Sequence, residues 1–115
     1  MFFRCLPIIT PMVLSGCVTP TTPTTRAELC RADASIAEAV MRGRQDGKPY
    51  DLYAEEFRNF DSGASPAADS RARRIALLLL DQAFMSPVEG NQREQDRIVT
   101  AFAQGAFEGC MRSNL

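Results

Sequence analysis

Apolar residues recur with the spacing of α-helices along the chain from residue 25 onward. The first helical segment begins with Thr25 and Glu28, which have the spacing of a capping box. Its apolar stripe consists of Leu29, Ala32, Ile36 and Val40. Gly43 and the turn-rich stretch that ends at Pro49 end this helix. Asp33 falls inside the stripe, so its carboxylate either lies where that face is open to water or is buried beside an arginine or a backbone donor.

Two further helical segments follow. One face of the second consists of Tyr50, Tyr53, Ala54, Phe57 and Phe60, and an aromatic stripe at this spacing is typical of a core face. Ser65 as N-cap and Pro66 in the first turn start the third helix. The apolar face of that helix consists of Ala72, Ile75, Ala76, Leu79, Leu80 and Ala83. Because residues 75–80 (IALLLL) are apolar almost all round, we expect this helix to be the central and most buried one.

Leu78 lies outside the apolar face of the third helix. At about 100° per residue it projects among charged side chains. It is therefore either covered by a neighbouring element or exposed for contact with a partner. If it is exposed, Leu78, Tyr53 and Phe57 are the candidate residues for contact with a protein partner.

The last helix begins at a cap supplied by Ser86 or Asn91 and runs to about Met111. Its apolar face consists of Ile98, Val99, Phe102, Ala106 and Cys110. Gly105 and Gly109 are four residues apart and are expected to let another backbone approach closely. The charged residues of this helix exclude a lipid-embedded position for it.

The first 16 residues have the pattern of a secretory signal. Arg4 supplies one positive charge, an apolar run from Cys5 to Leu14 follows, and small residues end the segment. The run is about ten residues long, whereas a membrane-spanning helix needs about 20. Pro7 and Pro11 also interrupt it, so no transmembrane anchor is expected. Residues 18–25 (VTPTTPTT) favour an extended tether, which at about 3 Å per residue holds the next domain about 20 to 25 Å from a lipid surface.

The signal ends in Leu14, Ser15, Gly16 and Cys17, which resemble the lipobox of bacterial lipoproteins. In that family the signal is cut before the cysteine, and the cysteine is acylated. The resemblance therefore implies cleavage between Gly16 and Cys17 and lipidation of Cys17. Val18 stands where the family's inner-membrane retention signal has aspartate, which implies sorting to the outer membrane of a diderm bacterium. The expected organisation is residues 1–16 as signal peptide, 17–25 as lipid anchor and tether, and 26–115 as helical domain.

Cys30 and Cys110 are the two cysteines left in the helical domain. One lies near the start of the first helix and the other near the end of the last. An exported chain enters an oxidising compartment, where a disulfide between them would persist. Such a bridge requires these two helices to pack antiparallel. Free thiols and metal ligation are the alternatives. The sequence thus predicts an all-α fold, a small bundle of three to four helices whose first and last helices are antiparallel and joined by a disulfide.

Composition and charge argue against an enzyme. The chain contains no histidine and no tryptophan, which excludes Ser/His/Asp and Cys/His catalytic arrangements. The net charge is -1, with 13 basic and 14 acidic residues, so nothing favours nucleic-acid binding. We expect no catalytic residues, no metal, no cofactor and no small-molecule substrate. Arg71, Arg73 and Arg74 form one local basic cluster, and Asp69, four residues before Arg73, is expected to pair with that arginine.

These observations favour a non-enzymatic, lipid-anchored envelope protein whose helical domain is a binding or structural accessory to another envelope component. Its expected attachments are the membrane, through Cys17, and a protein partner. The architecture also resembles the pilotins of secretion systems, small lipoproteins with a helical domain that bind a helix of their secretin. That resemblance implies that Leu78 and the helix from Tyr50 to Phe60 line the contact. A periplasmic chaperone or stress protein and an inhibitor or immunity lipoprotein are the alternatives.

Overall fold

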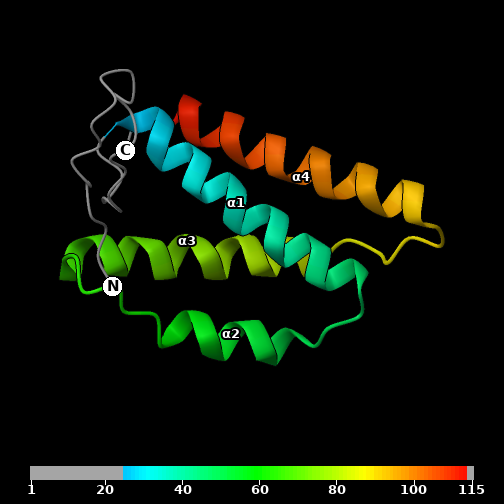
Figure 1. Ribbon diagram of the computed structural model, residues 1–115, viewed down its shortest axis with the longest axis horizontal. Coiled ribbons are helices and arrows are strands. Elements are labelled where there is room, and N and C mark those ends of the chain that lie inside the picture. Colours follow the sequence, from blue (N-terminus) through cyan, green and yellow to red (C-terminus); the bar gives the residue numbers. More distant parts are fainter. Residues whose placement is uncertain (1–24, 114–115) are drawn as a thin grey trace, which may run out of the picture.

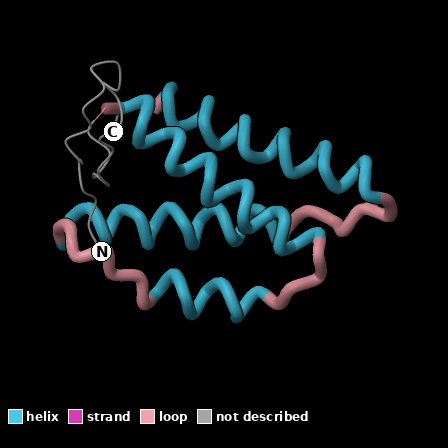
Figure 2. Tube along the Cα trace, in the orientation of Figure 1, coloured by secondary structure: helices cyan, strands magenta, loops and turns pink. Residues whose placement is uncertain are grey.

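The computed structural model describes residues 25–113, so the signal sequence, the lipobox and residues 18–24 of the tether lie outside the described residues. Four helices make up this part of the chain. They are α1 (Arg26–Gln45), α2 (Tyr50–Arg58), α3 (Pro66–Phe84) and α4 (Gln92–Arg112). No strand occurs between residues 25 and 113 (Figure 2). The expectation of an all-α fold is confirmed.

Side chains cap three of the helices at their N-termini. At α1 the Thr25 hydroxyl accepts from the Glu28 amide and the Glu28 carboxylate accepts from the Thr25 amide, which is the predicted capping box. Ser65 accepts from the Ala68 amide at the start of α3. Asn91 rather than Ser86 caps α4. The four donors at each helix start have no partner within the helix, so these caps fix where the helices begin.

The helices are arranged around α1, which packs along α4 on one side and against α3 on the other (Figure 1). The helix α2 packs against α3 (Figure 1). A disulfide joins Cys30 to Cys110, and Arg42 pairs with Asp96 at 2.7 Å near the opposite ends of the same two helices. Because the later position on α1 meets the earlier position on α4, the two helices are antiparallel, as expected. The helix α3 is one of two inner helices, so the expectation that it would be the single central one is not met.

The core consists of one cluster at the crossing of α1 and α3. Its fully packed members are Ala37, Val40, Met41, Ala54, Leu79, Leu80, Ala83 and Val99. Tyr53 and Phe57 of α2 pack against this cluster and are half-buried, with their ring centroids 6.2 Å apart. Tyr50 adds an edge-to-face contact with Phe84 and donates a hydrogen bond to Asp81. The aromatic stripe therefore attaches α2 to the core, although Phe60 at its end is exposed.

One glycine makes a close approach possible. A Cβ placed on Gly43 of α1 would lie 2.0 Å from the hydroxyl oxygen of Tyr53 and 2.5 Å from its Cζ, so the tyrosine ring crosses α1 where a side chain is absent. The prediction that Gly105 and Gly109 admit another backbone is wrong. A Cβ on either of them would meet nothing within 4 Å. Spacing along α4 identified a row of small residues but could not tell which face of the helix is covered.

Candidate functional site

The end of the domain that would follow the tether is held together by covalent and polar contacts. The Cys30–Cys110 disulfide has a Cα–Cα distance of 5.4 Å, and both cysteines are buried. Arg26, in the first turn of α1, donates to the backbone carbonyls of Cys110, Met111 and Ser113. The last carbonyls of a helix have no partners within the helix, so this arginine caps α4 from another element. The first residues of the domain are thereby fixed to its last helix.

A buried ion pair joins α1 to α3 at the same end. Asp33 is 5% exposed, and both of its carboxylate oxygens accept from Arg71, at 3.2 and 3.0 Å. Of the two environments that the sequence left open for Asp33, the structure has the buried one with an arginine partner. The bidentate geometry satisfies both oxygens, which is what a buried carboxylate requires.

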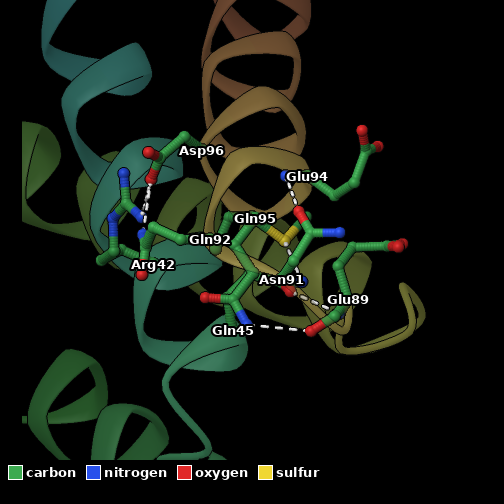
Figure 3. A network of polar contacts seen from close by, with 9 residues as sticks. Arg42, Gln45, Glu89, Asn91, Gln92, Glu94, Gln95 and Asp96 are labelled. Carbon is green, nitrogen blue, oxygen red and sulfur yellow. Dashed lines mark hydrogen bonds and ion pairs between the residues drawn. The ribbon is translucent and has the colours of Figure 1, made fainter.

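A polar network holds the opposite end, where α1, the α3–α4 loop and α4 meet (Figure 3). Gln45 is buried, and its amide donates to the Pro87 carbonyl at 3.0 Å and accepts from the Glu89 amide at 2.8 Å. Gln95 of α4 donates to the Glu89 carbonyl (Figure 3). Loop backbone needs such partners where secondary structure supplies none. This network therefore positions the loop.

The turn between α2 and α3 encloses a pocket of about 560 Å³. Its lining consists of Arg58, Asn59, Phe60, Asp61, Gly63, Ala64, Ser65, Pro66, Asp69 and Arg73. Asp69 is buried, and both of its oxygens accept from Ser62, one from the hydroxyl and one from the backbone amide. The Ser62 hydroxyl is the main reason why the pKa of Asp69 is lowered, so the carboxylate stays ionised. This pocket combines charged and aromatic side chains.

The pocket was not predicted from the sequence, and one local prediction about it is wrong. Asp69 does not pair with Arg73, because Ser62 of the preceding turn occupies the carboxylate. Arg73 instead donates to the Phe60 carbonyl at 2.7 Å. Helical spacing placed the two charges one turn apart but carried no information on the turn that folds back over them. The sequence does contain one feature that indicates this pocket, which is an arginine on each side of a glycine-containing turn.

The predicted contact residues have different environments. Leu78 is 50% exposed on the outer face of α3, so no element between residues 25 and 113 covers it. Met85, the C-cap residue of α3, is 83% exposed. Tyr53 and Phe57, by contrast, pack against the core cluster. Leu78 is thus available for contact, whereas the two aromatic residues serve the attachment of α2.

Gly16 and Cys17, the predicted cleavage and lipidation residues, lie outside the described residues. Within residues 25–113 no group of three or more metal-ligating side chains comes together. None of the helices α1 to α4 is both long enough and apolar enough to cross a membrane. Comparison of the chain with protein-family models, curated proteins and solved structures finds no match.

Proposed function

We propose that this chain is a non-enzymatic, lipid-anchored envelope protein whose helical domain is a binding or structural accessory to another envelope component. Residues 1–16 would direct export, and acylated Cys17 would hold the domain at the membrane. Two or more acyl chains give stable anchoring, whereas one gives only marginal binding. The domain itself would work by contact with a protein partner.

The observation that carries the proposal is the position of the disulfide. Cys30 lies in the second turn of α1, directly after the tether, and it joins that helix to the last helix of the chain. Disulfides form and persist in oxidising compartments, and they are rare in the cytosol. A disulfide at the tethered end of the domain agrees with the export and the anchoring that the lipobox implies.

Two exposed apolar side chains at the C-terminal half of α3 support a binding role. Leu78 of α3 and Met85, the C-cap residue that follows this helix, are seven residues apart, and both are at least half exposed. Single exposed apolar residues are common on proteins, so the proposal uses the combination of the two near one end of α3. We assign the contact to these residues because Tyr53 and Phe57 are engaged in the core.

The anchor is tested by fractionating cells that produce Cys17→Ala. We expect this variant to leave the membrane fraction and to lose metabolic labelling with a fatty acid. Cys5→Ala is the matched control, because it removes a cysteine from the same segment without changing the lipobox. A Cys17→Ala chain that remains in the membrane fraction would contradict the proposal.

The binding role is tested by placing a photo-crosslinking amino acid at Leu78 in living cells. The same amino acid at Thr100, an exposed position on α4, is the control. We expect a discrete crosslinked product at position 78 alone, and mass spectrometry should identify its partner as an envelope protein. Products of equal yield at both positions, or none at either, would contradict the assignment of the contact to α3.

A further inference from the structure

The pocket at the α2–α3 turn contains two arginines and two aspartates, but their hydrogen-bonding states differ. Asp69 accepts two hydrogen bonds from Ser62, and Asp61 accepts one from the Gly63 amide at 3.0 Å. The turn itself therefore uses oxygens of both carboxylates. These acids serve the conformation of the loop.

The arginines, in contrast, keep donors free. Arg58, at the end of α2, makes no hydrogen bond or ion pair with the described residues. Arg73 uses one guanidinium nitrogen to donate to the Phe60 carbonyl, which fixes the end of its side chain over the turn. A guanidinium has five N–H donors. Two guanidinium groups with unused donors thus line one pocket, and an anion between them would satisfy those donors and offset their mutual repulsion.

The remaining lining adds an amide and an aromatic surface. The Asn59 side chain makes no hydrogen bond with the described residues and can both donate and accept. Phe60 is 43% exposed and lines the pocket. A peptide group offers one donor and one acceptor, which a side-chain amide can match, whereas a phosphate group mainly accepts. The combination of guanidinium, amide and ring therefore fits a peptide better than it fits an isolated inorganic anion.

We propose that this pocket binds an acidic peptide segment of a protein partner. A carboxylate of that segment lies between Arg58 and Arg73, a peptide group meets Asn59, and an apolar side chain contacts Phe60. The pocket volume of about 560 Å³ falls in the range of ligand-binding pockets, which is about 300 to 1,000 Å³. The proposal rests on the proposed function, since it names the chemistry of the partner that an accessory protein would contact.

The test measures peptide binding to the full acylated protein in non-ionic detergent micelles. The probe is a rhodamine-labelled peptide of sequence GSLEDL with an amidated C-terminus, followed by fluorescence anisotropy. The neutral peptide GSLQNL is its counterpart, and inorganic phosphate is a competitor. We expect saturable binding of the acidic peptide, and affinity for the neutral one that is lower by about tenfold or more.

Variants of the pocket locate the binding. Arg58→Gln removes a guanidinium that makes no hydrogen bond or ion pair with the described residues, and it should weaken binding of the acidic peptide by about tenfold. Arg73→Lys keeps a donor for the Phe60 carbonyl and should weaken binding through the loss of the guanidinium fork. Arg93→Gln on α4 is the matched control and should bind like the wild type. Circular dichroism verifies that each variant is folded.

Several outcomes would overturn the inference. They are equal affinity for the neutral peptide, no binding of either peptide, unchanged affinity in Arg58→Gln, and displacement by phosphate at the affinity of the peptide itself. Failure here with intact crosslinking at Leu78 would refute the pocket assignment and leave the proposed function standing. Peptide binding together with a Cys17→Ala chain that stays in the membrane would refute the proposed function and leave the pocket assignment standing.

Discussion

Removing the Cys30–Cys110 disulfide is expected to cost this domain a large part of its stability. The two cysteines are 80 residues apart in sequence, so the bond closes nearly the whole helical domain into one loop. In the chain-entropy description, closing a loop of that length lowers the conformational entropy of the unfolded chain by about 15 cal/mol/K. This corresponds to a stabilisation of the folded state by about 4.5 kcal/mol at 25 °C. Because the free energy of unfolding of small domains is about 5 to 15 kcal/mol in total, this single bond supplies a large part of the stability.

The assay is urea denaturation followed by circular dichroism, with the oxidised wild type compared with the same protein after reduction and with Cys30→Ala/Cys110→Ala. Reduction leaves every side chain in place, so agreement between the reduced protein and the double variant separates the crosslink from packing. We expect both to lose about 3 to 5 kcal/mol of unfolding free energy. A loss below about 1 kcal/mol in the reduced protein would refute the argument, since loop closure could not then be the main contribution.

Three further perturbations test other contacts. Arg71→Met should lower the free energy of unfolding by about 3 to 5 kcal/mol in urea titrations, because it leaves the buried carboxylate of Asp33 unpaired, and adding Asp33→Leu should recover most of that loss. Gly43→Ala should lower that free energy by about 1 kcal/mol, since displacement of the tyrosine ring outweighs the gain in helix propensity; a more stable variant would refute the close approach. Arg42 is the main cause of the lowered pKa of Asp96, so this pair stabilises the fold above the unfolded pKa of about 3.9 and the contribution is lost as the pH falls through the folded pKa. Thermal melts across this acid range should therefore show a shallower pH dependence for Asp96→Asn, and an unchanged dependence would contradict the pairing.

Much of the fold could be predicted from the sequence, because the relevant signals are local. The capping box at Thr25 and the Ser65 cap depend on residues within one turn, and both are confirmed. The disulfide is a long-range contact, yet it could be predicted because only two cysteines were left for the domain and they lie at opposite ends of the first and last helices. Apolar periodicity located the buried face of α1 only approximately, because Val40 is buried whereas the other stripe residues, Leu29, Ala32 and Ile36, are half-buried.

The features that could not be predicted depend on contacts between elements, which apolar periodicity does not identify. The environment of Asp33 could not be decided from its angle on α1, because the partner Arg71 comes from another helix. The turn over Asp69 was missed for a similar reason, since Ser62 reaches it only through the path of the loop. The exposure of Leu78 likewise follows from which elements surround α3. In each case the feature depends on a contact between different segments of the chain. The apolar pattern of one helix gives the direction in which a side chain points, but it does not identify the residue that the side chain contacts.

The intact mass of the protein purified from membranes tests directly whether the chain is cleaved and lipidated at Cys17. We expect a chain that begins at Cys17, carries the mass of a lipid modification on that residue, and lacks the two hydrogen atoms lost on forming the Cys30–Cys110 disulfide. A chain that retains residues 1–16, or one that begins elsewhere without lipid, would show that Cys17 does not anchor the protein.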